Sequence, residues 1–196
     1  MPTTVHKLDS SQNIRVLCFD VESLGLHGTG WAVGWVYFES DGSEIESGYA
    51  ASAPDVLLGA GSRATEDFAW VQANTPYMAP NCANPAEVQA VFWRVWQRAR
   101  DEGALLVADC AWPVEARFLA ACVDADVDDR CWKGPYPLHD VATMRLAAGL
   151  DPLASTARRA NEEPKHHPIA DARQSGRLWF EARAAIYESR NGKEKP

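Results

Sequence analysis

The chain has 196 residues, of which 46% are hydrophobic and 23% are charged. This length fits one compact domain, and this composition excludes a disordered tail, a collagen-like fibre and a coiled coil. The 19 Lys and Arg against 27 Asp and Glu give a net charge of −8, which argues against binding long duplexes through many basic residues on one face. Two classes remain: a protein without a nucleic-acid function, or a protein whose acidic site binds divalent cations and acts on a short substrate.

The chain lacks the sequence signals of a membrane or secreted protein. No apolar run approaches the roughly 20 residues of a membrane span, and residues 1–12 lack a signal-peptide stretch. We therefore expect a cytoplasmic protein without membrane contact. The five cysteines are scattered without a C-x-x-C pair, which predicts reduced core residues rather than a disulfide framework or a zinc ribbon.

The first 51 residues carry the pattern of three strands. Residues 14–21 (IRVLCFDV) are β-branched and aromatic, as is typical of a short buried strand. Residues 31–39 alternate like a second strand, Asp41-Gly42 is a hairpin turn signal, and residues 44–51 form the returning strand. Three consecutive hairpin-linked strands are therefore predicted.

The remainder of the chain predicts helices around one further short strand. The expected elements are a long, partly helical excursion over 52–83, a capped helix from Asn84 to about Gly103, a strand over 104–108, helices from Pro113, over 140–148 and over 169–190, and a flexible tail over 191–196. This order favours one α/β domain over residues 1–196, with a core of about 14–190 and mixed strand directions.

Two carboxylates end the first strand, at Asp20 and Glu22. Side chains two apart in a strand point to the same face, so both project together. Two anions held a few ångströms apart repel, and their burial is costly unless they share a cation. Mg²⁺ and Mn²⁺ prefer such oxygen ligands. A lone D-x-E is also typical of an ordinary strand end with solvated charges, so this pattern alone leaves both interpretations open.

The D-V-E-S-L-G string of residues 20–25 resembles the first exonuclease motif, D-x-E-T-x-G, of the DEDDh superfamily of 3′–5′ exonucleases. This superfamily includes RNase T, oligoribonuclease and polymerase proofreading subunits. Its second mark is a histidine five residues before an aspartate at the start of the last helix, matched by His166 and Asp171. Residues 138–146 are similar to the D-T-x-x-L-A-R segment of the family, whose aspartate is usually structural. The resemblance spans about residues 14–185.

The family's middle motif, H-N-x-x-F-D-x-x-F-L, is matched less closely. Anchoring on Phe118-Leu119 puts Glu115 in the place of the aspartate, whereas Asp109 falls at the strand end, where the family often has histidine. A glutamate reaches one methylene farther, so it could bind metal from a slightly retracted helix. Glu115 is preferred, Asp109 is the alternative, and a third possibility is that neither contacts metal.

The resemblance implies a ribonuclease H-like fold, with three antiparallel N-terminal strands plus parallel strands, flanked by helices. It implies a metal-dependent 3′–5′ exonuclease that releases 5′-mononucleotides from the 3′ ends of short single-stranded RNA or DNA. The implied site has Asp20, Glu22, Glu115 (or Asp109) and Asp171 as ligands of two Mg²⁺ or Mn²⁺ ions, with His166 as the general base and His167 as its rival.

Substrate contacts are also expected around these motifs. Leu24 lies where the family places an apolar wedge between bases, Ser23 lies beside it, and Arg158 precedes the last motif. Other candidates have an alternative structural interpretation: Trp70, Tyr77 and Trp112 as stacking or core residues, and Arg63, Arg117, Arg158, Arg159 and Lys165 as phosphate-binding or merely solvated residues.

Other classes of function stay open. One is a catalytically impaired nucleic-acid-binding or scaffold protein on the same fold, which the altered middle motif would favour. Another is an endonuclease on RNA–DNA hybrids, against which the H-x-x-x-x-D ending speaks. The glycines at 28, 30 and 34 precede a strand rather than a helix, which excludes a dinucleotide-binding fingerprint. Many members of the superfamily are dimers, so a homodimer is a further possibility.

Overall fold

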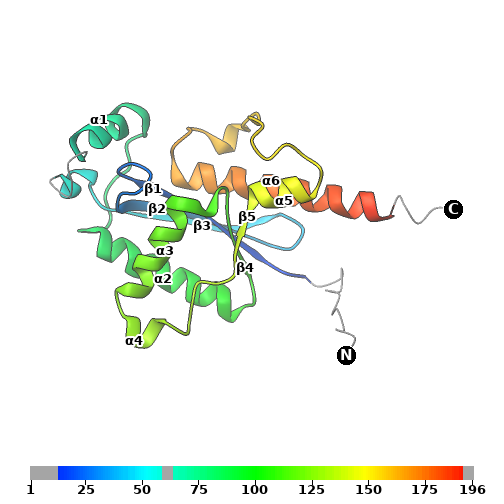
Figure 1. The fold of residues 1–196 in the computed structure, drawn as a ribbon, viewed down its shortest axis with the longest axis horizontal. Helices are drawn as coiled ribbons and strands as arrows, with labels where there is room; N and C mark the ends of the chain where they lie inside the picture. Colours follow the sequence, from blue (N-terminus) through cyan, green and yellow to red (C-terminus); the bar gives the residue numbers. More distant parts are fainter. Residues whose placement is uncertain (1–12, 59–63, 192–196) are drawn as a thin grey trace.

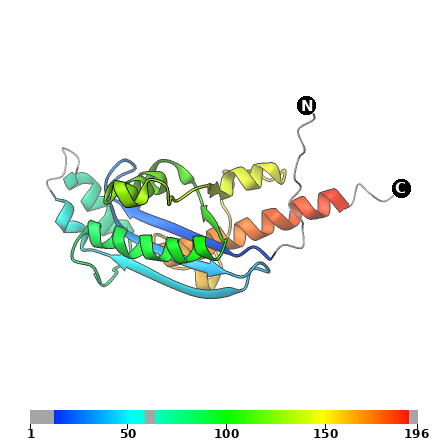
Figure 2. The same ribbon diagram turned by 90° about the horizontal axis from the view of Figure 1, so that it is seen from below.

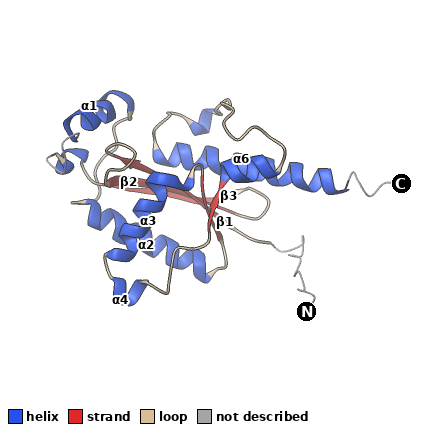
Figure 3. Cartoon of the chain, viewed as in Figure 1, coloured by secondary structure: helices blue, strands red, loops and turns tan. Residues whose placement is uncertain are grey.

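A computed structural model of the chain describes residues 13–58 and 64–191, and in these ranges a mixed sheet lies between helices (Figure 3). Five strands pair in the order β3-β2-β1-β4-β5. They are β1 (Val16–Ser23), β2 (Gly30–Phe38), β3 (Glu44–Ala51), β4 (Leu105–Ala108) and β5 (Leu138–Asp140). The first three are antiparallel neighbours, whereas β4 is parallel to β1 and β5 is parallel to β4. The predicted α/β class with a mixed sheet is confirmed.

One face of the sheet is covered by α2 (Pro85–Asp101) and α3 (Ala116–Asp124) (Figure 1). From β1, Phe19 packs on Phe92 with ring centroids 5.0 Å apart, and Phe92 packs edge-on against Phe118 at 5.6 Å. Fully burying an aromatic side chain of this kind contributes roughly 1.5–3 kcal/mol. Leu17, Phe19 and Val21 of β1 belong to this larger hydrophobic core.

The opposite face is covered by α5 (Val141–Ala147) and by α6 (Pro168–Asn191), whose C-terminal half continues beyond the sheet (Figure 2). Val16 and Cys18 of β1 pack there against Trp179 in a second core cluster. Because side chains alternate along a strand, Asp20 and Glu22 belong to this same row. The sheet thus carries both carboxylates of the first motif to the face where α6 begins.

The start of α6 approaches the sheet at Gly34, the β2 residue paired with Asp20. A Cβ atom at Gly34 would lie 2.4 Å from main-chain atoms of Pro168 and Ile169. Only a residue without a side chain fits this approach. The first turn of α6 is therefore seated directly beside the carboxylate end of β1.

Helix starts follow local signals. Asn84 accepts a hydrogen bond from the Glu87 amide at 3.1 Å, and the Glu87 carboxylate accepts one from the Ala83 amide at 2.6 Å, which completes the predicted cap of α2. Asp140 caps α5 and also accepts a bond from the Ala111 amide at 2.8 Å. Asp140 is thus tied to main-chain groups, in keeping with the structural part that the resemblance implied.

Several elements differ from the predicted pattern. The excursion over 52–83 is partly helical, as predicted, with a 3₁₀ turn at Pro54–Leu57 and α1 (Ala64–Asn74); the differences lie in later elements. The helix predicted from Pro113 begins irregularly: a π-helical turn, Ala111–Glu115, contains an extended Trp112, and regular α-helix begins at Ala116. A short α4 (Val127–Arg130), strand β5 and a 3₁₀ turn, Ala160–Glu162, were not predicted. These pieces are too short to give a periodic signal.

The cysteine prediction holds in part. All five are free, and Cys18 and Cys122 are buried, but Cys110 and Cys131 are exposed. The expectation that all are core residues is wrong for these two, because one follows the end of β4 and the other follows α4. In the described ranges no helix is long and apolar enough to cross a membrane. The predicted tail lies outside the described residues except for Asn191, which ends α6.

Candidate active site

Acidic side chains from three separate elements meet beside the end of β1. Pairing between β1 and β4 stops at Cys18, so the last residues of β1 have no strand on that side. The turn that carries Glu115 lies next to this free stretch. Asp20 and Glu22 come from β1, and Asp171 comes from the first turn of α6. The sheet edge, the turn and the helix start together position these four carboxylates.

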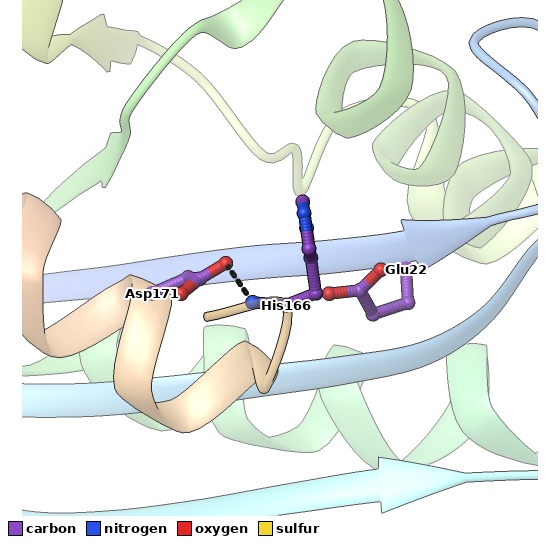
Figure 4. A group of neighbouring side chains, drawn as sticks. All are labelled: Glu22, His166 and Asp171. Carbon is purple, nitrogen blue, oxygen red and sulfur yellow. Dashed lines mark hydrogen bonds between the residues drawn. The ribbon is translucent and has the colours of Figure 1, made fainter. Parts of the chain in front are cut away.

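Three of the predicted residues are close enough to share one cation. Single ligand atoms of Glu22, His166 and Asp171 all lie within 4.8 Å of one another. Figure 4 shows Glu22 and Asp171 on either side of His166. The Glu22 side chain is buried, whereas His166 and Asp171 are partly exposed. This geometry suits a divalent ion that a ligand can reach from solvent.

The protonation of the β1 carboxyls reflects their crowding. Burial, with repulsion from Asp171 and Glu115, raises the pKa of Glu22 to about 8. Burial, followed by repulsion from Glu22, holds the pKa of Asp20 well above its usual range. Both effects disfavour the charged forms. A cation bound among these groups would restore the charged forms that metal ligation requires.

Glu115 and Asp109 differ in their surroundings. Glu115 is buried, and burial raises its pKa to about 7 although main-chain hydrogen bonds from Glu115 itself and from Val21 oppose the change. Asp109 follows the end of β4 and is exposed as a residue, although burial of its carboxyl, followed by repulsion from Asp140, also raises its pKa. Repulsion from Glu115 contributes to the raised pKa of Glu22. Repulsion from Asp109 is the weakest of the causes that raise the pKa of Asp20. The geometry therefore favours Glu115 as the acidic group beside β1.

Both carboxylate oxygens of Asp171 already have partners. Arg158 donates a hydrogen bond to Oδ1. The His166 main-chain amide donates one to Oδ2 at 3.1 Å, drawn as the dashed line in Figure 4. The Arg158 and Asp171 side chains are only 14% and 17% exposed. Among the four carboxylates, Asp171 is the only one that forms an ion pair within residues 13–58 and 64–191. The cluster is therefore short of positive charge, and its oxygen donors fit Mg²⁺ or Mn²⁺.

The two histidines face different neighbours. The His166 ring lies 5.3 Å from the Trp70 ring in a T-shaped contact, whereas the His167 ring lies 6.2 Å from Tyr49. His166 has a φ of 61°, in the left-handed region, and this turn directs its amide to Asp171. Burial is the main cause that lowers the pKa of both imidazoles. An imidazole held neutral near pH 7 can accept a proton.

The three residues expected to contact substrate all contact other residues of the chain. Leu24 is buried in an apolar cluster with Trp31 and Val71, so its contact with a base requires that cluster to open. The Ser23 hydroxyl donates to the Gly25 carbonyl at 2.7 Å. Arg158 lies on Asp171 instead of facing solvent. Ser23 and Arg158 therefore have intramolecular partners in the absence of substrate.

The aromatic candidates for base stacking are all exposed to solvent. Trp70, Trp112 and Tyr77 are 52%, 66% and 87% exposed, which excludes the core alternative for all three. Arg159 pairs with Glu181, and Arg63 lies outside the described residues. Sequence reasoning missed the contact of Trp70 with His166 and the close approach at Gly34. No local signal marks either, because both depend on distant segments.

Comparisons with known proteins bear on the fold. No family model and no curated protein sequence matches the chain. Solved structures do match: a zinc-bound complex of E. coli exonuclease I with single-stranded DNA has a TM-score of 0.53 at 14% identity, over 91% of this chain and 41% of that one. An E. coli exonuclease I complex with a dT13 oligonucleotide has a TM-score of 0.52 at 14% identity, over 93% and 42%. The chain therefore has the ribonuclease H-like fold of these structures.

Exonuclease I from Methylocaldum szegediense is similar to the same degree, with a TM-score of 0.53 at 14% identity over 92% of this chain and 41% of that chain. Our chain thus spans about two fifths of the length of these exonuclease I chains. At this identity the likeness concerns the ribonuclease H-like fold and its five-stranded sheet. The activity must be argued from the residues at the carboxyl end of β1.

Proposed function

We propose that the protein is a metal-dependent 3′–5′ exonuclease that releases 5′-mononucleotides from single-stranded RNA or DNA. The observation that carries this proposal is the meeting of Asp20, Glu22, Glu115 and Asp171 beside His166. These residues come from β1, the turn before α3 and the start of α6. An acidic cluster with an adjacent neutral imidazole is the donor set of two-metal phosphodiester hydrolysis.

The carboxylates would hold two divalent ions. Bound there, Mg²⁺ or Mn²⁺ supplies an activated water and stabilises the leaving 3′ oxygen. His166 accepts the proton from the attacking water, because its lowered pKa keeps the ring neutral near pH 7. The Trp70 ring lies against this imidazole in a T-shaped contact. Asp171 would have to be freed from Arg158 before both of its oxygens can serve the ions.

A single strand is the substrate that the surface supports best. The exonuclease I structures that share this fold were determined with single-stranded DNA and with a dT13 oligonucleotide. Trp70, Trp112 and Tyr77 are exposed, and exposed aromatic rings stack on bases without regard to sequence. The net charge of −8 weakens long-range attraction to phosphates. Short strands with metal-assisted binding are therefore favoured over long duplexes.

Digestion of end-labelled oligomers tests the proposal. Single-stranded RNA and DNA carrying a 5′ label are incubated with Mg²⁺ or Mn²⁺, with chelator controls and with a circular single strand. Progressive shortening from the 3′ end, release of 5′-mononucleotides and an intact circle are expected. Cutting of the circle would instead indicate an endonuclease, and unchanged linear strands at every metal concentration would exclude the exonuclease.

The second candidate is a nucleic-acid-binding protein that has lost catalysis. Two observations favour it: Glu115 stands where the family has aspartate, and Asp171 is paired with Arg158. Such a protein would retain labelled single strands in a binding assay with metal present and would leave their length unchanged. The same oligomers therefore separate the two candidates.

A further inference from the structure

A segment preceding α6 is clamped onto that helix. We call residues 156–163 the Arg158 segment. Arg177 of α6 donates to the Ala157 carbonyl at 3.0 Å, Arg173 donates to the Asn161 carbonyl at 2.8 Å, and Gln174 donates to the Thr156 hydroxyl at 3.2 Å. Three side chains of one helix thus hold the Arg158 segment in place.

A buried ion pair fixes the centre of the segment. Glu162 is 1% exposed, and its two oxygens accept hydrogen bonds from Arg177 at 2.6 and 2.9 Å. The Arg159 amide also donates to this carboxylate at 2.8 Å. A buried, hydrogen-bonded pair of this kind holds one geometry because breaking it leaves an uncompensated charge. The Arg158 segment is therefore a rigid support.

Arg158 reaches from this support into the acidic cluster. Its Nε donates to the Glu162 carbonyl at 2.7 Å, and a terminal nitrogen donates to Asp171 Oδ1. The side chains of Arg158 and Asp171 are both largely buried. A guanidinium carries its charge at any physiological pH. Arg158 thus supplies one fixed positive charge at the point where a metal ligand is expected.

Resting on the proposed function, we propose that Arg158 is a positioning residue that competes with the divalent ion for Asp171 and moves to a substrate phosphate when the ion binds. Two cations on one carboxylate oxygen repel each other, so metal binding at Asp171 requires the guanidinium to leave. A guanidinium binds phosphate through paired N–H donors. The phosphate of a bound 3′ end gives Arg158 a new partner beside the site. Metal and substrate therefore favour each other's binding, as linkage requires.

Metal affinity without turnover tests this competition. Mn²⁺ is titrated calorimetrically into wild-type protein, Arg158→Gln and the matched control Arg159→Gln. Arg159 is the next residue of the same segment, but it is 64% exposed and its guanidinium pairs with Glu181. Both variants remove one positive charge, and only Arg158→Gln frees Asp171. We expect Arg158→Gln to bind Mn²⁺ about tenfold more tightly, the equivalent of one charged hydrogen bond, and Arg159→Gln to change the affinity less than about twofold.

Two further measurements complete the test. Arg158→Lys, which keeps the positive charge, is the second variant in case Arg158→Gln does not fold. Its Mn²⁺ affinity is expected to lie between those of wild type and Arg158→Gln. A phosphorothioate oligomer, which resists hydrolysis, should tighten Mn²⁺ binding to wild type more than it tightens Mn²⁺ binding to Arg158→Gln. Equal Mn²⁺ affinities of wild type, Arg158→Gln and Arg158→Lys would overturn the competition even if the protein is an exonuclease. Tighter Mn²⁺ binding to Arg158→Gln, together with no release of mononucleotides by the wild-type protein, would overturn the proposed function alone.

Discussion

Glu22 lies in one row of β1 with Cys18 and Asp20, on the face that α6 covers. Neutralising it in Glu22→Gln removes a buried charge that repels Asp171 and Glu115. We expect the metal-free variant to melt about 5 °C above wild type at about pH 8, and its metal-dependent activity to be lost. Glu188→Gln, at an exposed site of α6, is the control and should change neither property. More than a few per cent of wild-type turnover in Glu22→Gln would exclude Glu22 as a ligand.

His166 and His167 can be separated by substitution. His166→Ala should lower turnover by about 10²–10⁴-fold, the usual contribution of a general base, and His167→Ala should lower it much less. Because His166 has a φ of 61°, His166→Gly should be about 1 kcal/mol more stable than His166→Ala while equally inactive. Turnover and urea unfolding of the three variants give the answer. A larger loss of turnover in His167→Ala would assign the role to His167.

The identity of the third acidic group is tested by metal affinity. Glu115 is buried beside β1, so Glu115→Gln should weaken Mn²⁺ binding, and Glu115→Asp should restore part of the activity. Asp109 is exposed, so Asp109→Asn should leave the Mn²⁺ affinity within about twofold of wild type. Calorimetric titration measures all three variants. Wild-type affinity in Glu115→Gln with a loss in Asp109→Asn would exchange the two assignments.

Among the elements, the crossing of β2 by the start of α6 controls the site. Gly34→Ala would place a methyl group 2.4 Å from main-chain atoms of Pro168 and Ile169. The helix start must then shift, which should cost about 2 kcal/mol of unfolding free energy and weaken Mn²⁺ binding, because this turn carries Asp171. Urea unfolding and Mn²⁺ titration measure the two effects.

A second glycine provides the control. Gly103 has a φ of 72° and no atom within 4 Å of an added Cβ, so Gly103→Ala introduces backbone strain without a clash. It should cost about 1 kcal/mol and leave Mn²⁺ affinity unchanged. If Gly34→Ala behaved like Gly103→Ala, the contact between β2 and α6 would not position the site.

For the whole molecule, the acidic cluster makes metal-free stability depend on pH. The folded pKa values of Glu22 and Glu115 are about 8 and about 7, above the ordinary value of 4.5. Between these limits the folded chain binds more protons than the unfolded chain. The stability that these groups contribute is therefore complete below about pH 4.5 and is lost as pH rises through about 7 to 8.

Thermal melts in chelator and in Mg²⁺ test this dependence. The melting temperature in chelator should fall by about 5 °C between about pH 5 and about pH 8, and Mg²⁺ should remove most of that fall because it stabilises the ionised carboxylates. Glu22→Gln should show a shallower fall in chelator than wild type. A melting temperature that rises over this range in chelator would contradict the raised pKa values.

The sequence predicts the parts of this fold that depend on neighbouring residues better than the parts that depend on residues far apart in the chain. The three antiparallel strands, the cap of α2 and the long α6 follow from alternation, turn residues and capping groups within a few positions. The irregular turn before α3 was missed because Pro113 predicts a regular helix start. Instead, Trp112 has the extended backbone that is favoured before proline, and regular helix begins only at Ala116.

The sequence by itself determined which groups are candidates for binding a cation. Asp20 and Glu22 share a face because strands have a period of two. The five-residue spacing of His166 and Asp171 places the histidine in the turn that precedes α6 and the aspartate in the first turn of that helix. Only the tertiary structure decided that Glu115 is buried and Asp109 exposed, that Leu24 packs in a core cluster, and that Arg158 lies on Asp171. These outcomes depend on how separate elements pack around the end of β1, and packing between distant segments leaves no local pattern in the chain.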